Sequence, residues 1–318
     1  MPDSKPAFPA HITAEMTLVT PADARRYLDT MHANRSESRL EVAILSDVLK
    51  EGQWYGGISP VFFDDKDCPW DGQHRFEAVI KTGLPAYMLF IRGVREEEAE
   101  YIDTGRKRTY ADSLRIRGVP DYKRRSVVSR HLALYAKYGI EGIRTPASLA
   151  LTPAEKDAWV DAPGMSEAIK AGEALARAVK ANPAYAAYAV FRTVHGEVPD
   201  GIDADGFWEK VRSGANLSDL DPALTLRNQL LAGKARFNRS GKIDPRLMEL
   251  YLLATAWNKH ITGERWTRPQ PVFETRADGT KVFPASQVPD FLPLDAKRRH
   301  IGDLRAAYAS VKGKASGE

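Results

Sequence analysis

The sequence has 318 residues, of which 43% are hydrophobic and 28% are charged, and its formal net charge is +4. This composition is typical of a folded protein with a buried core, and the length suggests one large or two ordinary domains. No run of residues approaches the roughly 18 apolar residues of a membrane span, and the N-terminus lacks the pattern of a signal peptide. The single cysteine, Cys68, excludes an internal disulfide and a cysteine-based zinc site. These features favour a cytoplasmic protein without a membrane partner.

The first third of the chain alternates between helix and strand signals. Residues 1–15 are rich in proline and lack periodicity, which predicts a loose arm. Thr20 as an N-cap followed by Pro21 predicts a helix over 20–31. An apolar stripe predicts a second helix over 36–52. The later elements are expected to be a strand over 58–65, a helix over 74–83, a buried strand over 85–93, a short acidic helix over 95–103 and a helix over 110–118.

Strand signals fade beyond about residue 120. Helical patterns follow one another up to about residue 263, and Asp, Ser or Thr capping residues and terminal glycines separate them. A Pro-rich segment covers 267–293, and a basic tail begins at Lys297. We therefore expect an α+β protein. Its parts would be an arm over 1–15, a small mixed α/β domain over 16–118 and an α-helical domain over 119–318.

The stretch "DGQHR", residues 71–75, stands where the first expected strand meets the next helix. Gly72 allows a sharp turn, and the unpaired amides at a helix N-terminus form a natural anion site. Arg75 has a planar fork suited to phosphate oxygens. Asp71 could hold Mg²⁺ or accept a proton, and His74 could move a proton. The plainer alternative is that Asp71 caps the helix, His74 packs and Arg75 pairs with an acid such as Glu77.

Basic residues cluster shortly after this stretch. A polyanion such as nucleic acid or a nucleotide phosphate is the partner that such clustering favours, and a solvated face is the alternative. Between residues 106 and 130 only two acids, Asp112 and Asp121, stand against nine bases: Arg106, Lys107, Arg108, Arg115, Arg117, Lys123, Arg124, Arg125 and Arg130.

Residues 17–118 resemble the ParB/sulfiredoxin-like superfamily. The resemblance rests on "HANRSESRLEVAILSDVLKEGQWYGGISPVFFDD" and "DGQHRFEAVIKTGLPAYMLFIRG", which follow the family's order of a first box, a helix, a strand, a DG-x-HR turn and helix, and a further strand. The continuation "DTGRKRTYADSLRIRG" looks like proteins common in actinobacterial phages, and "FWEKVRSGANLSDLDPALTLRNQL" is similar to their C-terminal part. The resemblance implies a ParB/sulfiredoxin-like fold with a nucleotide or phosphate at the 71–75 turn.

The superfamily divides by chemistry. Sulfiredoxin places its catalytic cysteine directly before the motif's histidine, and that position is Gln73 here, so sulfinic acid repair is not expected. ParB partition proteins bind CTP at this turn and carry helix-turn-helix DNA readers. In the free-serine kinases, the Asp and His of the box assist phosphoryl transfer, and Asp71 and His74 occupy those positions. DNA-phosphorothioation regulators also carry a DGQHR box.

The resemblance implies roles for particular residues. Asp71, His74 and Glu37 would be catalytic, and Asp71 would also hold Mg²⁺. Glu41 is a second carboxylate on the same expected helix, and Glu37 is preferred to it as the base. The plainer alternative for Glu37 is an exposed glutamate that the helix dipole favours. Trp54 and Trp70 could stack on a base or simply pack. Nucleotide binding is expected from Gly72, Gln73, Arg75, Asn34, Arg35 and Arg106, and DNA binding from Lys107, Arg108, Arg115, Lys123, Arg124 and Arg125.

Three functions stay open from the sequence. The first is a kinase that uses ATP, or another nucleoside triphosphate, with Mg²⁺ to phosphorylate a hydroxymethylated pyrimidine in phage DNA, inside the bacterial host. The second is a ParB-like switch that binds CTP or ATP and DNA without transferring phosphate. The third is a ParB-like nuclease, for which too few carboxylates can be placed. No convincing helix-turn-helix lies in 120–160, which favours the enzyme. The oligomeric state is left open.

Overall fold

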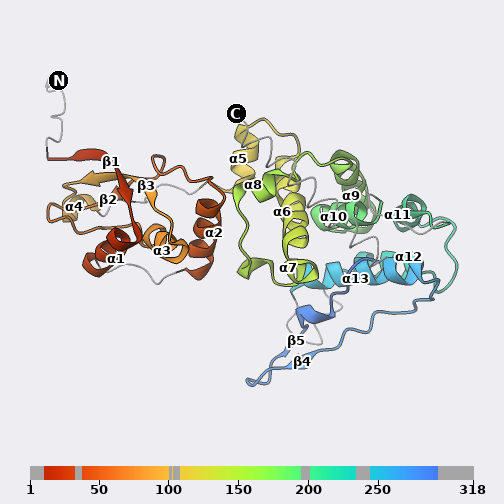
Figure 1. The fold of residues 1–318 in the computed structure, drawn as a ribbon. Coiled ribbons are helices and arrows are strands. Elements are labelled where there is room, and N and C mark those ends of the chain that lie inside the picture. The colour runs from red at the N-terminus through yellow and green to blue at the C-terminus, as the bar shows by residue number, and fades with distance from the viewer. Residues whose placement is uncertain are drawn as a thin grey trace, which may run out of the picture. The chain divides into compact units, whose positions relative to one another are not determined.

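The computed structural model describes residues 11–32, 38–99, 102, 108–194, 201–233 and 244–292. The chain divides into two compact units, one ending at Arg108 and the other beginning at Thr109 (Figure 1). The protein is α+β and mostly helical with a small sheet, which confirms the α+β part of the expected fold class. The first unit contains the sheet, and the second contains the run of helices.

Among its described residues, the N-terminal unit has a sheet of three strands in the order β1-β3-β2. The central strand β3 (Ala86–Arg92) pairs antiparallel with β1 (Thr13–Val19) and parallel with the short β2 (Val61–Phe62). The central position of β3 agrees with its nearly continuous apolar sequence. The expected arm over 1–15 is wrong for its last residues, because β1 already begins at Thr13. This strand alternates exposed apolar and polar residues over a short stretch, which is a weak sequence signal.

The helices of this unit are α1 (Pro21–Thr30), α2 (Arg39–Lys50), α3 (Gln73–Thr82) and α4 (Glu96–Ala99). The predicted N-cap of α1 is confirmed, because Thr20 and Asp23 form a reciprocal capping box. Tyr27 of α1 packs between the rings of Phe63 and Phe76, with centroid distances of 5.2 and 5.3 Å. These contacts bring α1 and α3 onto one face of the sheet, where the core of the unit lies.

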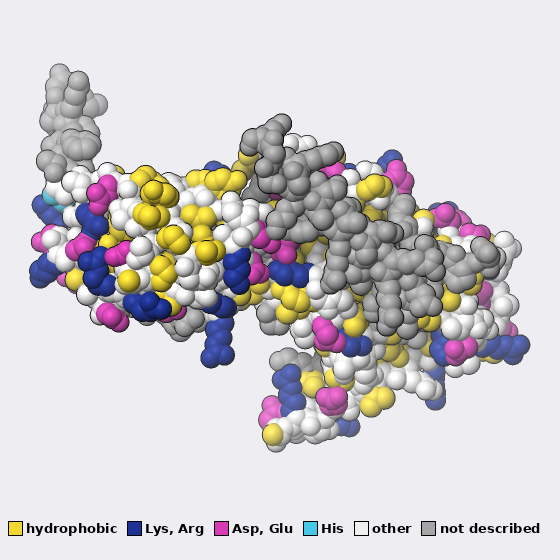
Figure 2. Space-filling view, in the orientation of Figure 1, with side chains coloured by type: hydrophobic (Ala, Val, Ile, Leu, Met, Phe, Trp, Pro, Cys, Tyr) yellow, Lys and Arg dark blue, Asp and Glu magenta, His cyan; other side chains and the backbone are white. Residues whose placement is uncertain are grey.

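The opposite face of the sheet is largely uncovered by the described residues. Met16, Leu18 and Tyr87 are 52%, 45% and 59% exposed on it. Figure 2 shows hydrophobic side chains gathered on the surface of this unit. The sheet therefore has one face packed by helices and one apolar face that meets solvent.

The second unit is built from helices, a small hairpin and short 3₁₀ turns. Helices α9 and α10 approach closely, because a Cβ on Gly172 would lie 2.5 Å from the carbonyl oxygen of Pro183. The elements are α5 (Tyr110–Ile116), α6 (Tyr122–Tyr138), α7 (Ile140–Arg144), α8 (Pro153–Asp157), α9 (Met165–Val179), α10 (Pro183–Val194), α11 (Ala204–Ser213), α12 (Pro222–Ala232), α13 (Pro245–Ile261), and the hairpin β4 (Glu274–Thr275) and β5 (Lys281–Val282).

The division between the units falls ten residues before the expected boundary at 118. The reason is that α5 belongs to the helical unit. Leu114 is fully buried, and both the Tyr110 hydroxyl and the Arg117 guanidinium donate to Asp157 Oδ1, at 2.7 and 2.8 Å. Among the described residues, no helix is long and apolar enough to cross a membrane.

A buried polar cluster fastens the end of the described chain to the helices. Asp290 accepts hydrogen bonds from the Tyr135 hydroxyl at 2.9 Å and from Arg192 Nη2 at 3.2 Å. The Arg192 guanidinium also lies 3.5 Å from the centroid of the Tyr135 ring. Burial alone disfavours the charged form of Arg192, yet Tyr188 and Asp290 raise its pKa above its ordinary value. Arg192 is therefore charged inside the core, and its contact with Asp290 fixes the position of the last segment.

Candidate functional site

The turn before α3 depends on Gly72. Its φ is +98°, a left-handed conformation that residues with a side chain rarely adopt. A Cβ at this position would also come within 3.0 Å of Val61 Cγ1 and 3.2 Å of Val61 Cγ2. The carbonyl oxygen of Gly72 accepts the amides of Arg75 and Phe76, at 2.9 and 3.0 Å, so the helix begins directly after it. The expected sharp turn and the helix start at this joint are confirmed.

The first amides of α3 have no side-chain cap. Thr20 caps α1 and Ser38 caps α2, whereas Gly72 has no side chain with which to cap α3. Within the described part of the chain, no acceptor is found for the amides of Gln73 and His74. The positive end of the helix dipole lies at the same place. This end of α3 can accept an anion without breaking an existing cap.

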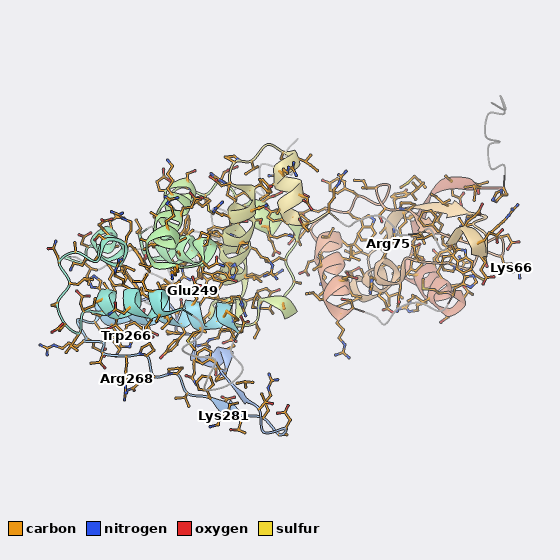
Figure 3. All side chains as sticks on the ribbon, turned by 180° about the vertical axis from the view of Figure 1, so that it is seen from behind. Lys66, Arg75, Glu249, Trp266, Arg268 and Lys281 are labelled. Atoms are coloured by element: carbon orange, nitrogen blue, oxygen red, sulfur yellow. The ribbon has the colours of Figure 1, made fainter. Side chains whose placement is uncertain are left out.

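Asp71 and Arg75 form an ion pair beside this helix start. Arg75 is labelled in Figure 3. Asp71 Oδ2 accepts from Arg75 Nη2 at 2.7 Å, and Asp71 Oδ1 accepts the Phe62 amide at 2.8 Å. Arg75 Nη1 also donates to the carbonyl oxygens of Ser59 and Pro60, the latter at 2.9 Å. The two side chains therefore tie α3 to the start of β2. Asp71 does not act as the cap of α3.

His74 is held between two partners from α2 and its N-cap. Its Nε2 accepts the Ser38 amide at 2.9 Å, and its Nδ1 lies 3.0 Å from Glu41 Oε2. Because Nε2 accepts a hydrogen bond, the proton must sit on Nδ1, which donates it to the carboxylate. The His74 side chain is 28% exposed. The structure thus places a carboxylate and an oriented imidazole next to the uncapped amides.

The Mg²⁺ role expected for Asp71 fits this arrangement poorly. Each of its oxygens already accepts a hydrogen bond, and one of them does so from the Arg75 guanidinium. A divalent cation at Asp71 would have to compete with that positive charge. Mg²⁺ in nucleotide sites is held mainly by phosphate oxygens and water, with one or two carboxylates. Asp71 as placed fits the role of Arg75's partner better than that of a metal ligand.

Several expected site residues lie outside the described part of the chain. They are Asn34, Arg35, Glu37, Arg106 and Lys107. Gln73 is half-buried at the first position of α3. Of the two carboxylates considered on the second helix, Glu41 is the one that the structure describes, and it contacts His74. Sequence reasoning favoured Glu37 and therefore missed this contact.

Among the described residues that were expected to bind DNA, some are exposed and others are engaged in contacts within the helical unit. Arg108, Arg115 and Lys123 are exposed. Arg124 Nε pairs with Glu173 Oε1 at 2.9 Å. Arg125 is only 5% exposed, and its guanidinium donates to the Val160 carbonyl oxygen at 2.6 Å and to Ser166 Oγ at 2.7 Å. The expectation that Arg125 faces nucleic acid is therefore corrected, because it holds α6 against the first turn of α9 and the segment before it.

Trp54 and Trp70, the two tryptophans that could have stacked on a base, form hydrogen bonds within the N-terminal unit. Trp54 Nε1 donates to the Tyr87 carbonyl oxygen at 2.8 Å, and Trp70 Nε1 donates to the Val94 carbonyl oxygen at 3.0 Å. The Trp70 ring stacks on His32 with a centroid distance of 3.7 Å and an interplanar angle of 9°. Trp70 therefore stacks on a side chain of its own unit.

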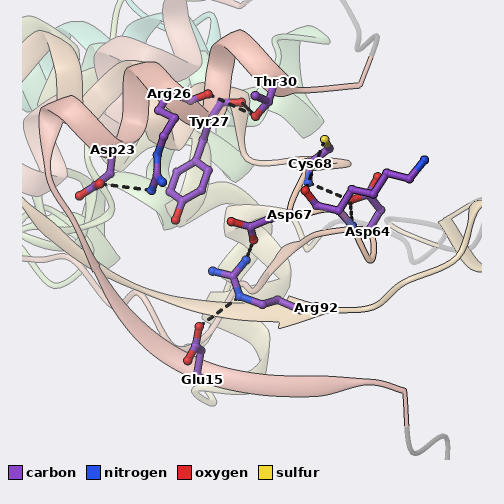
Figure 4. Close-up of polar contacts among 10 residues, drawn as sticks. Glu15, Asp23, Arg26, Tyr27, Thr30, Asp64, Asp67, Cys68 and Arg92 are labelled. Carbon is purple, nitrogen blue, oxygen red and sulfur yellow. Dashed lines mark hydrogen bonds and ion pairs between the residues drawn. The ribbon is translucent and has the colours of Figure 1, made fainter.

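His32 and Asp64 form a second polar pair in this unit that sequence reasoning missed. His32 Nε2 lies 2.9 Å from Asp64 Oδ2. Burial opposes ionisation of Asp64, but hydrogen bonds from the Cys68 amide and from His32 lower its pKa below the usual value. Figure 4 shows the contact between Asp64 and Cys68. This pair fixes the loop that leads into the 71–75 turn.

A second group of cations lies in the helical unit, and the sequence pattern pointed only to Arg130. Burial lowers the pKa of Arg130, and the charge of Arg246 lowers it further. Burial and the charge of Arg130 likewise lower the pKa of Lys156. Arg130 of α6 therefore repels both Arg246 of α13 and Lys156 of α8, and Arg246 also pairs with Asp244 at 3.3 Å. An anion bound beside them would relieve that repulsion.

Comparisons of this chain with protein-family models, with curated proteins and with solved structures found no match. The function of the site is therefore argued from its geometry and from the motif resemblance. His74 and Glu41 contact each other at a helix start that has no side-chain cap. Asp71 and Arg75 instead stabilise the turn before that helix.

Proposed function

We propose that this protein is an ATP-dependent phosphotransferase whose acceptor is the hydroxyl of a hydroxymethylated pyrimidine in DNA. The observation that carries the proposal is the start of α3. There, a left-handed Gly72 leaves the first amides uncapped, next to an imidazole that Ser38 and Glu41 hold in one orientation. The resemblance of the DGQHR box to the box of the free-serine kinases supports the reaction class.

The triphosphate would bind at the amides of Gln73 and His74. Backbone N–H groups at a helix start donate hydrogen bonds to phosphate oxygens, and the helix dipole favours negative charge there. A glycine at the turn lets the phosphates approach the main chain closely, since no side chain stands in the way. Arg75 and Asp71 would support this turn rather than touch the phosphates, because their contacts are made within the fold.

In the transfer step, the acceptor oxygen forms a bond to the γ-phosphorus. The bond between the γ-phosphorus and the β–γ bridging oxygen breaks, and ADP leaves with that electron pair. The proton of the acceptor hydroxyl passes to a carboxylate. Glu41 is suited to receive it, because its carboxylate is half-exposed and His74 orients it at 3.0 Å. Glu37 stays the base predicted from the resemblance. Most of the rate would come from positioning and charge.

DNA is proposed as the carrier of the acceptor because of the exposed cations. Arg108, Arg115 and Lys123 are available to phosphate oxygens. A pyrimidine inside a duplex would have to be extruded before its hydroxyl could reach the γ-phosphate.

One observation favours a second candidate, a nucleotide-binding DNA switch that transfers no phosphate. Asp71, which the kinase resemblance would make catalytic, is engaged by Phe62 and Arg75. With Asp71 stabilising the turn, the site could bind a triphosphate and change the affinity of the protein for DNA without transferring a phosphoryl group. This candidate shares the binding site with the kinase and differs from it only in the transfer step.

The test uses γ-labelled ATP, Mg²⁺ and DNA that contains hydroxymethylated pyrimidines, followed by digestion to nucleosides. The kinase proposal expects label in a modified nucleoside with the wild type and its loss with His74→Ala. His11→Ala is the matched control, because His11 also pairs with a glutamate in the same unit, at 3.1 Å. Saturable nucleotide binding and nucleotide-dependent DNA retention without label would support the switch. Neither binding nor label would overturn both.

A further inference from the structure

The uncovered face of the sheet forms an apolar surface that continues onto a neighbouring loop. Leu18 of β1 lies opposite Tyr87 of β3, and Met16 lies opposite Leu89. Tyr55 and Ile58, from the segment between α2 and β2, are also strongly exposed. Contiguous apolar side chains on a protein surface mark interaction sites more often than isolated ones do. This surface belongs to the N-terminal unit alone.

Strand β1 is also an edge of the sheet, and among the described residues no hydrogen-bond partner is found on its outer side. The Leu89 amide donates to the Gly56 carbonyl oxygen at 3.1 Å, and the Phe63 amide donates to the Ile91 carbonyl oxygen at 2.8 Å, so Leu89 and Ile91 face the β2 side. Backbone groups alternate along a strand, so Met88 and Phe90 face β1. Their partners in β1 are Thr17 and Glu15. The groups of Ala14, Met16 and Leu18 therefore point away from the sheet.

Two devices that natural proteins use to protect a strand edge, a proline and a bulge, are not found along the described residues of β1. The strand has no proline, and its pairing with β3 runs from Thr13 to Val19 without a bulge. Its only charged side chain, Glu15, is paired with Arg92 Nε at 3.1 Å (Figure 4). A seven-residue edge of this kind is a template for pairing with another strand. The opposite edge, β2, has only two residues and follows Pro60, so it is a poor template.

We propose that β1 pairs with β1 of a second copy of this chain, antiparallel and about a two-fold axis at Met16. In this register Met16 faces Met16 of the partner subunit, and Ala14 faces Leu18 of the partner subunit, through the outward backbone groups. Glu15 faces Thr17 of the partner subunit, so no like charges meet. The two three-stranded sheets join into one, and their exposed apolar faces become continuous across the junction.

The neighbouring registers are less favourable, which is why the proposal commits to this one. A two-fold axis at Glu15 would place two carboxylates directly opposite each other, and like charges in that position destabilise a sheet. An axis at Thr17 would leave only residues 15–19 to pair. A second copy is also favoured over an unrelated peptide, because the strand is complementary to itself when it is centred at Met16. The start of α3 lies on the helix-covered face, so the junction leaves it free. The pairing does not depend on the proposed phosphotransfer.

The first test is the molar mass of the full chain in solution over a concentration series, by sedimentation or light scattering. The proposal expects a dimer that dissociates on dilution. Met16→Lys should give a monomer, because two ammonium groups would meet at the axis. Val272→Lys is the control, since Val272 is 64% exposed in the helical unit, and it should leave the dimer intact. A wild type that stays monomeric at every concentration overturns the proposal, as does a Met16→Lys variant that dimerises like the wild type.

The second test reads the register by disulfide trapping in a Cys68→Ser background, which removes the only native thiol. Directly opposed, hydrogen-bonded residues have Cα atoms about 5.5 Å apart, within reach of a disulfide. Met16→Cys should therefore give a covalent dimer under mild oxidation. Leu18→Cys should not, because the two copies of residue 18 would be about 13 Å apart along the strands. Equal trapping of both variants, or trapping of Leu18→Cys alone, contradicts the proposed register.

Discussion

The polar cluster of Arg192, Asp290 and Tyr135 in the helical unit and the cluster of His74, Glu41 and Ser38 in the N-terminal unit are both held by hydrogen bonds. They differ in exposure. Arg192 and Asp290 side chains are 4% and 8% exposed, whereas those of His74 and Glu41 are 28% and 51% exposed. Water cannot replace a lost partner in the first cluster, but a ligand can reach the second. Removing a partner should therefore cost stability in the helical unit and ligand binding in the N-terminal unit.

The largest effect is expected for Asp290→Ala. The substitution would leave Arg192 charged and unpaired inside the core, which typically costs about 3–5 kcal/mol of unfolding free energy. The measurement is urea denaturation at neutral pH. Glu209→Ala is the control, because it removes an exposed pair with Arg212 on α11, and it should leave the midpoint unchanged. Equal effects of the two variants would contradict the claim that the buried Arg192–Asp290 contact contributes more to stability than an exposed ion pair.

The next effect is a pH dependence from His131. Burial lowers the pKa of His131 from 6.5 to about 4. As pH falls through this window, the unfolded chain takes up the proton first, so stability is full above about pH 6.5 and falls towards pH 4. The loss is of the order of a few kcal/mol. His131→Gln removes the titration, so its unfolding free energy should be flatter over this window. Parallel curves for variant and wild type would contradict the assignment.

A smaller loss is expected for Arg75→Ala. The variant would remove the hydrogen bonds that Arg75 donates to Asp71 Oδ2 and to the carbonyl oxygens of Ser59 and Pro60, which costs about 1–3 kcal/mol. The change should also weaken nucleotide binding, because the turn would no longer be tied to β2. Arg26→Ala is the control, since Arg26 is mostly exposed and pairs with Asp23 within α1 at 3.3 Å. Denaturation and nucleotide titration of both variants make the comparison. Unchanged stability of Arg75→Ala would contradict its structural role.

The smallest effect concerns DNA affinity. Arg115→Ala and Lys123→Ala should each lower the slope of log affinity against log salt by about 1, if each side chain neutralises one phosphate. Arg125→Ala should instead lower stability and leave the slope unchanged, because Arg125 is engaged with Val160 and Ser166. Fluorescence anisotropy with a labelled duplex at several salt concentrations gives the slopes. A reduced slope for Arg125→Ala alone would reverse this assignment.

Local signals in the sequence account for most of the helices. Thr20 with Pro21 predicts the start of α1, and Gly83 predicts the end of α3, because capping is a short-range property. Strand β1 was missed because its exposed Met16 and Leu18 do not distinguish a strand from an arm. The place of α5 in the helical unit was also missed. It depends on contacts with Asp157, about 40 residues along the chain.

The site was predictable in its residues and less so in their roles. The glycine turn and the helix start at Gln73 follow from the letters of the DGQHR stretch. The pairing of Asp71 with Arg75 was hidden, although their spacing of four residues allowed it. The contact between His74 and Glu41 joins two helices, and no local pattern contains it. Arg125 shows the same limit, because periodicity alone did not separate it from its exposed neighbours on α6.

The central claim is that the start of α3 binds a triphosphate, and amide chemical shifts report on it directly. The ¹⁵N-labelled full chain is titrated with ATP and Mg²⁺, and the amides of Gln73 and His74 are compared with those of the first turn of α1, which Thr20 caps. The account predicts the largest, saturable shifts at Gln73 and His74 and little change in α1. Saturation with no shift at Gln73 and His74, or with the main shifts elsewhere, would contradict it.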